Sequence, residues 1–397
     1  MNETKNIRKE KIDLVVKCIA LYFVMMPFDS FPMFGLGSIL KIVAIIPIFV
    51  ILILHRENRI HINKLTGIFV FYVMYNLITC FYSINIDASV MEAKRLILNA
   101  VLILVVGAIY QSYNYSEVNY LIKALSIGGI ATAIMTLIFS DTSHSGRLTI
   151  SLNGAVQDQN YINGYILFAY AYCMNKVIDE KKFIYLLPSL LFVVFTLMTG
   201  SRGALLAFAV ISVMIFIFNA FNTGKIRFGV IIMSIIIVII ILLGYESILD
   251  ILPSEISVRF SADYIRNYKG TNRTDLWIEI LKIFNDGNWF RKIFGYGYGT
   301  VPLVNTFNHL VAHNLWLDHL VSGGVIGILI MSFMHAYFLR QAWKEKNSIV
   351  FSVYTGYLVM CMTLSLTNYK PLWNAIMMIM ILYNARRKKK INNFKMT

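Results

Sequence analysis

Long runs of apolar residues, separated by short polar tracts, cover most of the 397-residue sequence. Each run is close to the ~20 residues that a helix needs to cross about 30 Å of hydrocarbon. The runs lack the apolar/polar alternation of a membrane barrel, and backbone groups in lipid must pair within their own segment, so the pattern predicts helices. The predicted spans are 12–28, 36–54, 64–84, 93–110, 117–139, 160–178, 183–199, 204–219, 226–244, 318–339, 348–367 and 371–385.

These spans predict an all-α fold: a polytopic transmembrane helix bundle of about twelve spans. No polar block is long enough to fold alone, so residues 1–397 are expected to form a single integral membrane domain. The longest polar stretch, 245–317, is predicted to be a long extracytoplasmic loop. Within this loop, ISVRF (256–260) and RTDLWIEILKIF (273–284) have the apolar spacing of amphipathic helices at the membrane interface.

Composition excludes an ordinary soluble domain, because 58% of the residues are hydrophobic and only 14% are charged, against about a quarter charged in globular proteins. A net charge of +15 would suggest a nucleic-acid partner in a soluble protein. Here the basic residues fall in short tracts on one side of the predicted spans, so membrane orientation explains them and no nucleic acid is expected. Both termini are predicted to be cytoplasmic, on the basis of Arg8, Lys9, Arg56, Arg59, Lys64, Lys181, Lys182, Lys225, Arg227, Arg340, Lys344, Lys346 and residues 386–390.

Arginines on the opposite, outer face run against this charge bias and are candidates for function. Arg202 lies in TGSRGALLAF (199–208), where one predicted span ends outside and the next begins. A guanidinium group at the mouth of a bundle suits bidentate binding of a phosphate. A headgroup anchor explains the bare residue equally well. Arg147 and Arg273 are further outer-face arginines, and as loop residues they are expected to be solvated.

A histidine-rich segment, NHLVAHNLWLDHLVSGGVIG (308–327), precedes the next predicted span. If the helix begins near Ala312, His313 and Asn314 share its first turn at the membrane surface. A neutral imidazole there can accept a proton from a sugar hydroxyl. The alternative is an aromatic-belt role, which is favoured for His319. His309 and His313 also have a spacing compatible with zinc, but no third ligand accompanies them, so no metal is expected.

The motif KIFGYGYGT (292–300) alternates glycine with tyrosine. Glycine permits tight turns, and the tyrosine rings are predicted to stack on sugars. Neither a strand nor a G-x-x-G-K pattern frames the motif, so it is not a nucleotide fingerprint. No D-x-D motif lies on either face. Any glycosyl transfer is therefore expected to use a lipid-linked donor and cationic side chains, without a cofactor.

Four features in order resemble the O-antigen polymerase and O-antigen ligase superfamily, whose bundle fold also appears in peptidoglycan polymerases. They are Arg147 followed by QDQN (157–160), the SRGA turn at Arg202, the NR…W…GYGYG stretch (272–299) and AHNLWLDHLVSGGVIG (312–327). The resemblance covers roughly residues 140–330, and the hydropathy on both sides is compatible with it.

The resemblance implies a metal-independent, inverting glycosyltransferase of the bacterial cytoplasmic (inner) membrane. Its site would face outward and use undecaprenyl-diphosphate-linked oligosaccharides. By position, Arg202 would bind the leaving diphosphate with help from Arg147 and Arg273, and His313 would be the general base. The remaining substrate-binding residues would be Asp158, Asn160 and Asn314. The implied partners are the lipid-linked oligosaccharide, membrane lipid, a chain-length regulator and a flippase.

The final segment resembles the polymerases of O-antigen or capsule repeat units more than the ligases, although His309 and His313 leave the ligase open. A lipid-linked oligosaccharide flippase would also have about twelve spans, but it should show two related halves and charges at mid-membrane. A non-catalytic assembly partner would need no Arg/His constellation. The sequence therefore favours a polysaccharide polymerase, with the ligase, the flippase and the assembly partner as alternatives.

Overall fold

A computed structural model describes residues 12–30, 39–55, 62–142, 146–152, 155–223, 250–261, 263–264, 273–305 and 309–394. The helices in these ranges are α1 (Leu14–Val24), η1 (Met26–Ser30), α2 (Ile39–Val43), α3 (Ile45–Leu54), α4 (Lys64–Thr79), η2 (Cys80–Tyr82), α5 (Ile86–Leu104), η3 (Val105–Ile109), α6 (Tyr115–Ile138), α7 (Gln159–Ile178), η4 (Phe183–Tyr185), α8 (Leu186–Met198), α9 (Arg202–Thr223), α12 (Ser254–Phe260), α14 (Arg273–Asp286), α15 (Trp289–Phe294), α16 (Val301–Val304), α17 (Leu315–Lys344), α18 (Ser348–Cys361) and α19 (Lys370–Phe394).

Short polar side chains at the ends of the apolar runs determine where many helices begin. Asn63 accepts a hydrogen bond from the Thr66 N–H at the start of α4, and Asn114 forms a reciprocal capping box with Glu117 on α6. Such caps satisfy N–H groups that have no partner within the helix. These two helices therefore start with some of their first backbone donors paired.

The prediction of an all-α membrane bundle is confirmed. Every predicted span overlaps one or more helices except 226–244, which lies outside the described residues, as do Arg8 and Lys9. Four described helical segments are long and apolar enough to cross a membrane: Lys64–Tyr82, Tyr115–Ile138, Arg202–Phe221 and Leu315–Lys344. Shorter apolar helices accompany them at Leu14–Val24, Ile39–Leu54, Phe183–Met198 and Ser348–Cys361.

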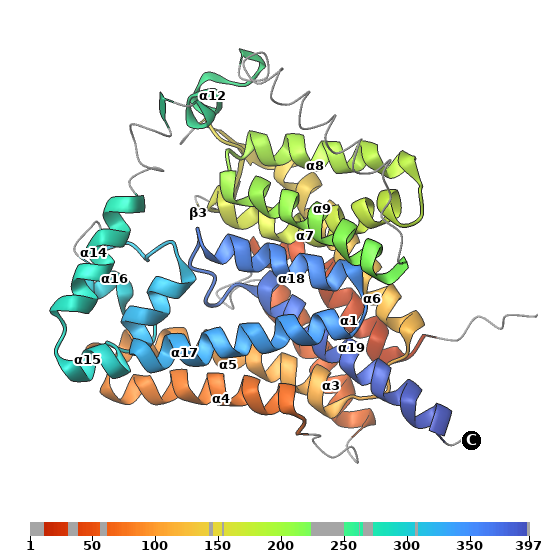
Figure 1. Cartoon of the computed structure of the whole chain (residues 1–397), viewed down its shortest axis with the longest axis horizontal. Helices are drawn as coiled ribbons and strands as arrows, with labels where there is room; N and C mark the ends of the chain where they lie inside the picture. Colours follow the sequence, from red (N-terminus) through yellow and green to blue (C-terminus); the bar gives the residue numbers. More distant parts are fainter. Residues whose placement is uncertain are drawn as a thin grey trace, which may run out of the picture.

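The long helices lie side by side with their axes in similar directions (Figure 1). In that view α4, α5, α17 and α18 cross the lower and middle parts of the molecule, and α7, α8 and α9 cross the upper part. The short helices α14, α15 and α16 gather at one end of the bundle, opposite the end where the chain terminates. The polar loop region is thus concentrated at one end of an apolar bundle.

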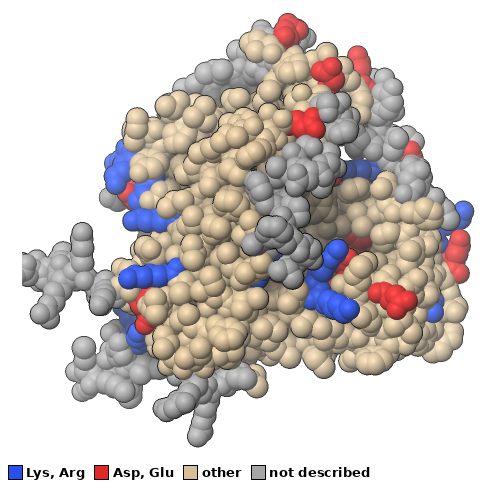
Figure 2. Space-filling view, turned by 180° about the vertical axis from the view of Figure 1, so that it is seen from behind, with Lys and Arg blue, Asp and Glu red and all other residues tan. Residues whose placement is uncertain are grey.

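Charged side chains are sparse along the middle of the bundle. Figure 2 shows a largely uncharged surface over the left half of the molecule, bordered by Lys and Arg side chains at the left edge. To the right of centre, Lys and Arg side chains appear together with Asp and Glu side chains, and further Asp and Glu side chains lie at the top. The left edge in this view is the end where α19 terminates. This distribution agrees with a hydrocarbon environment around the middle of the bundle.

A small sheet interrupts the otherwise helical fold between α6 and α7. Its antiparallel strands are β1 (Ser140–Asp141), β2 (Thr149–Leu152) and β3 (Ala155–Val156), with the order β1-β2-β3. Ser140 pairs with Ile150, and Ser151 pairs with Val156. The sequence does not predict these strands, because strands of two to four residues are too short to show a periodic pattern.

A break in α17 at Gly324, whose φ is +66°, creates a tight crossing with α15 and the segment that follows it. The carbonyls of Val321 and Ser322 accept hydrogen bonds of 2.9 Å from the backbone N–H groups of Tyr296 and Gly297. The Gly323 carbonyl accepts from the Tyr75 hydroxyl. Carbonyls at this break are thereby paired, as backbone at membrane depth requires.

The same crossing explains the glycine–tyrosine motif at 292–300. Gly295 has φ +84°, and a Cβ atom there would lie 2.3 Å from the Ser322 carbonyl oxygen. Tyr298 is only 1% exposed, and its hydroxyl donates to Asn368 at 3.3 Å. The prediction that this motif stacks on sugars is therefore wrong for Tyr298, because its ring is buried and its hydroxyl is paired within the protein. Gly295 serves the close packing against α17.

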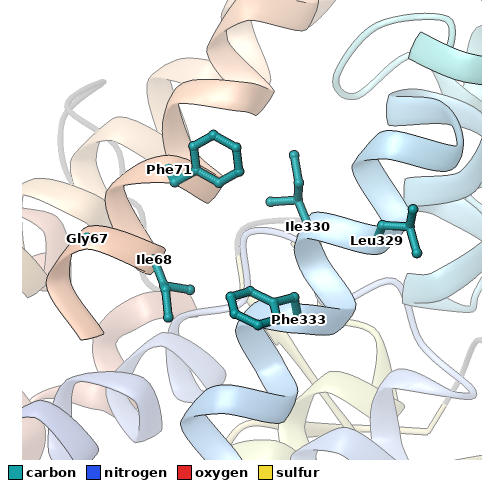
Figure 3. Close-up of a pocket in the computed structure, with 6 residues that line it drawn as sticks. All are labelled: Gly67, Ile68, Phe71, Leu329, Ile330 and Phe333. Atoms are coloured by element: carbon teal, nitrogen blue, oxygen red, sulfur yellow. The ribbon is translucent and has the colours of Figure 1, made fainter. Parts of the chain in front are cut away.

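Below this crossing, α4 and α17 separate and leave an apolar groove of about 340 Å³. Figure 3 shows Ile68 and Phe71 of α4 on one side, with Ile330 and Phe333 of α17 on the other. Phe71 and Phe333 are both well exposed on the bundle surface. A groove with this lining suits hydrocarbon chains and offers no polar group for chemistry.

We expect Gly324→Ala to lower the melting temperature of the detergent-solubilised protein by about 5 °C or more, because a Cβ atom would meet the Ile293 carbonyl oxygen at 2.3 Å. Gly67→Ala on α4 is the matched control, since a Cβ atom there has nothing within 4 Å. Its melting temperature should be unchanged or slightly higher. Equal melting temperatures for the two variants would contradict a tight crossing at Gly324.

Candidate active site

Arg147 is a buried side chain that links the loop after β1 to the end of α8. Its Nε donates to the Thr199 carbonyl at 2.7 Å, and its Nη2 lies 3.4 Å from Asn160 Oδ1. The residue is only 8% exposed. The expectation that this loop arginine is solvated is therefore wrong. The reason is that the Leu148 N–H donates to the Met198 carbonyl, which draws the loop onto the end of α8.

The turn between α8 and α9 brings further arginines to the same place. Gly200 has φ +63°, and a Cβ atom there would lie 3.0 Å from Arg147 Nε and 3.4 Å from Arg259 Nε. Arg202 is the first residue of α9, two positions further on. A glycine is required at position 200 because guanidinium groups from two other segments pack against the turn.

Arg147, Arg202, Arg259 and Arg273 are close enough to influence one another electrostatically. Burial, together with the charges of Arg259 and Arg273, lowers the pKa of Arg147 to about 10. Burial also lowers the pKa of Arg259 and of Arg273, and the positive charge of Arg202 lowers both further. A pKa near 10 still leaves Arg147 protonated at neutral pH. We call these four residues the arginine cluster.

Among the described residues, none of the four arginines forms an ion pair with a carboxylate. The Asp158 carboxylate lies near enough to oppose the pKa shifts of Arg147 and Arg273, but one carboxylate cannot balance four guanidinium groups. The Arg259 Nε is buried without a hydrogen-bond partner in the described part of the chain. Buried donors without partners are costly, so the cluster is suited to an anion with several charged oxygens.

A pocket of about 400 Å³ opens beside Arg147 and Arg259. The short helix α12 contributes Glu255, Val258 and Arg259 to its lining, and Tyr264 lies at its edge. The pocket therefore combines two guanidinium groups with a carboxylate and a phenol. Such a mixture can accommodate an anionic group together with hydroxyl-rich parts of a ligand.

His313 lies within electrostatic reach of this cluster, although it is more than a hundred residues from Arg202. Burial lowers its pKa, the Arg273 charge lowers it further, and the Asp158 carboxylate opposes the shift. His313 Nδ1 is buried without a partner among the described residues. The imidazole is therefore neutral at pH 7 and has a free nitrogen for a ligand.

The predicted start of the following helix is wrong by three residues. Helix α17 begins at Leu315, and Asn314 caps it by accepting from the N–H groups of Trp316 and Leu317. His313 precedes the cap with φ +48°, a left-handed conformation that few residues other than glycine adopt. The Asn314 amide also donates to the Met362 carbonyl at 3.2 Å. This side chain, which the sequence predicts to bind substrate, therefore has a structural role.

The two neighbouring histidines occupy different environments. His319 is 1% exposed and pairs with the Tyr72 hydroxyl at 2.8 Å, so it is a packing residue inside the bundle and not a belt residue. His309 is exposed, and its Nδ1 lies 3.2 Å from the Pro302 carbonyl oxygen. Across the described ranges, no three His, Cys, Asp or Glu side chains converge where a metal ion could sit. The zinc alternative therefore finds no third ligand there.

The structure thus brings together Arg147, Arg202, Arg273, Asp158, Asn160 and His313. Sequence reasoning missed Arg259, which was assigned only to an amphipathic helix. The signal was available, since Arg259 is another arginine in the predicted outer loop and runs against the same charge bias that singled out Arg202.

Sequence reasoning also missed the turn between α18 and α19, residues 362–366. Its Met362 carbonyl accepts from Asn314, and its Ser365 carbonyl accepts from the Tyr161 hydroxyl at 3.0 Å. Thr363 packs against Gly203, where a Cβ atom would lie 2.5 Å from its hydroxyl oxygen. This turn therefore contacts the segments that carry His313, Asp158 and Arg202.

These features define a membrane helix bundle with the arginine cluster and a neutral histidine at one end. Residues 187–332 match the model of a family described as O-antigen ligase, which confirms the resemblance to the O-antigen polymerase and ligase superfamily. One solved structure, described as "Structural coordination of polymerization and crosslinking by a peptidoglycan synthase complex", contains a chain with 14% identity and a TM-score of 0.48. The similarity covers 81% of this chain and 96% of that chain. No curated protein matches the sequence.

We predict that Arg259→Ala weakens the binding of inorganic pyrophosphate by about 10- to 100-fold, because a charge-assisted hydrogen bond contributes about 1.5–3 kcal/mol. Isothermal titration calorimetry on the solubilised protein measures this. Arg95→Ala is the matched control, since Arg95 is an exposed arginine on α5 paired with Glu92 at 2.6 Å. If both variants bind pyrophosphate like the wild type, the arginine cluster is not the anion site.

Proposed function

We propose that this protein is a surface-polysaccharide polymerase of the bacterial cytoplasmic membrane. It transfers a glycan from an undecaprenyl-diphosphate-linked donor to a sugar hydroxyl of a lipid-linked acceptor. The observation that carries the proposal is the arginine cluster, whose four guanidinium groups lie within electrostatic reach of a neutral histidine. Within the described ranges, none of the four is paired with a carboxylate. A diphosphate leaving group and a base for the acceptor are the two requirements that this arrangement meets.

In the proposed reaction, His313 accepts the proton of the acceptor hydroxyl as the oxygen attacks the anomeric carbon of the donor. The bond between that carbon and the diphosphate oxygen breaks, and the diphosphate leaves with the bonding electron pair. Arg202 stabilises the developing negative charge, with Arg147, Arg259 and Arg273 in support. A single displacement inverts the anomeric configuration. The imidazolium then releases its proton to water.

The location of the cluster supports a site on the extracytoplasmic face. A group of basic side chains from the ends of α17 and α19, residues 340–346 and 386–389, lies where α19 terminates. His313 and Arg273 belong to the segments at the opposite end, around α14 (Figure 1). The positive-inside rule assigns the basic end to the cytoplasm. Lipid-linked oligosaccharides would then meet the site from the outer leaflet.

An O-antigen ligase is the second candidate function, because the family model that matches residues 187–332 carries that description. The ligase reaction uses the same leaving group and the same base, and differs only in the acceptor. The arginine cluster therefore serves both functions equally. The acceptor used by the purified protein distinguishes them.

The purified protein should extend a lipid-linked repeat unit into a ladder of longer glycans, and Arg202→Ala should abolish this ladder without lowering protein abundance in the membrane. Arg202→Lys should restore part of the activity, because a point charge cannot reproduce a bidentate fork. Arg95→Ala should leave the ladder unchanged. Transfer of the glycan only to an acceptor other than a lipid-linked repeat unit would indicate the ligase. A full ladder from Arg202→Ala would contradict the proposed role of Arg202.

The acid limb of the kcat/KM profile should lie below pH 6.5, because His313 has a lowered pKa and must be neutral to act as a base. Activity should be constant near pH 7 and fall as protonation begins at lower pH. Arg273→Gln removes a charge that lowers this pKa, so the limb should move to higher pH. Arg95→Gln should not move it. An unchanged acid limb in His313→Gln would assign the limb to another group.

A further inference from the structure

His313 is held in a strained conformation by its neighbours. His313 has a left-handed φ of +48°, and His309, four residues earlier, has a left-handed φ of +52°. Such conformations persist only where the surrounding structure imposes them, and they concentrate at functional sites. Whatever fixes the segment before α17 therefore also fixes the direction of the His313 imidazole.

Side chains provide that support. Among the described residues, every hydrogen bond that reaches the backbone of residues 310–312 comes from a side chain. Asn305 donates to the Leu310 carbonyl at 2.8 Å, Trp277 Nε1 donates to the Ala312 carbonyl at 3.0 Å, and Asp318 Oδ1 accepts from the Ala312 N–H at 3.0 Å. Both polar groups of the residue that precedes His313 are thus held by side chains from α14 and α17.

We propose that Asp318 is a positioning residue, which holds the Ala312 backbone so that the His313 imidazole faces the arginine cluster. This inference rests on the proposed function only for the role given to His313. Asp318 is 6% exposed, and one carboxylate oxygen is used by the Ala312 N–H. The groups that shift the His313 pKa besides burial are Arg273 and Asp158, so Asp318 acts on His313 through the backbone and not through its charge.

Trp277 holds the carbonyl group of the same residue, Ala312. It lies four residues after Arg273 on α14, so the two side chains project from the same face of that helix. The helix therefore delivers a guanidinium group of the cluster and, one turn later, the indole that fixes the Ala312 carbonyl. Asp318 and Trp277 together set the distance between His313 and Arg273.

The second carboxylate oxygen of Asp318 makes a conservative substitution informative. Asp318 Oδ2 and Ser365 Oγ are both buried without a hydrogen-bond partner in the described part of the chain, and the Ser365 hydroxyl lies beside the carboxylate. Asparagine at position 318 can still accept from the Ala312 N–H, and its amide can donate to Ser365. Asp318→Asn therefore keeps the support and removes only the charge.

The kinetic test compares Asp318→Ala with Asp318→Asn in lipid-linked repeat extension. Asp318→Ala should lower kcat by ~100-fold with the donor KM unchanged, as expected for a misplaced base. Asp318→Asn should retain most of the wild-type kcat. In a His313→Ala background, Asp318→Ala should cause no further loss. Equal loss in the Asn and Ala variants, or an added loss in the His313→Ala background, would overturn the positioning role.

A labelling test reports the position of residue 313 without requiring glycosyl transfer. In a Cys18→Ser, His313→Cys protein, we measure the rate of modification by a membrane-impermeant methanethiosulfonate; the other native cysteines are buried. Asp318→Ala and Trp277→Phe should each change this rate several-fold, whereas Asp318→Asn and the exposed control Trp289→Phe should not. Unchanged rates in Asp318→Ala and Trp277→Phe would refute the inference. If the labelling rates change as expected but His313→Ala has normal turnover, His313 is not the general base, and Asp318 still positions residue 313.

Discussion

Electrostatic repulsion among four neighbouring guanidinium groups is the constraint on which the rest of the site depends. The groups come from four separate segments: the loop before β2, the start of α9, α12 and α14. The described hydrogen bonds of the cluster are made to neutral partners. Arg147, for example, donates to the Thr199 carbonyl and to the Asn160 amide oxygen. Neutral partners fix the geometry and leave the positive charge available to a ligand.

Resisting this repulsion requires a rigid frame, and the turn at residues 362–366 supplies much of it. The turn joins the cap of α17 through Asn314, the start of α7 through Tyr161 and the start of α9 through Gly203. Each contact reaches the first turns of a long helix, where a small shift would move the adjacent functional residue. The site is therefore built on the ends of packed helices and not on free loops, which suits precise placement of reacting groups.

Much of the fold could be predicted because lipid allows few solutions for a long apolar run. Arg202 was identifiable because it defies the charge bias of the membrane, and Arg259 could have been found by the same reasoning. The burial of Arg147 could not, since it depends on a pairing between Leu148 and Met198, fifty residues apart. The start of α17 was misplaced although Asn314 is a strong cap, because the apolar residues 310–312 lie directly before it and extend the apolar pattern upstream.

The role of the turn at 362–366 lay beyond sequence reasoning altogether. Its sequence, MTLSL, carries no motif, and its partners Asn314 and Tyr161 are 48 and 204 residues away from their contacts in the turn. The glycine–tyrosine motif was misread for a related reason. Its composition is compatible with sugar stacking, and only the folded structure reveals that Gly295 packs against α17 and that Tyr298 is buried with its hydroxyl on Asn368.

The unbalanced positive charge of the arginine cluster has a consequence for turnover. Under the proposed function, the site holds its lipid diphosphate product more tightly than its substrate, because the detached diphosphate carries an additional negative charge. Strong binding of the product slows departure of the spent carrier, so this departure competes with formation of the glycosidic bond as the slow step of the cycle. Residence time of that product should shorten as ionic strength rises, since mobile ions compete for the same guanidinium groups. A growing glycan made by such an enzyme would lengthen at a pace that depends on carrier clearance from the outer leaflet.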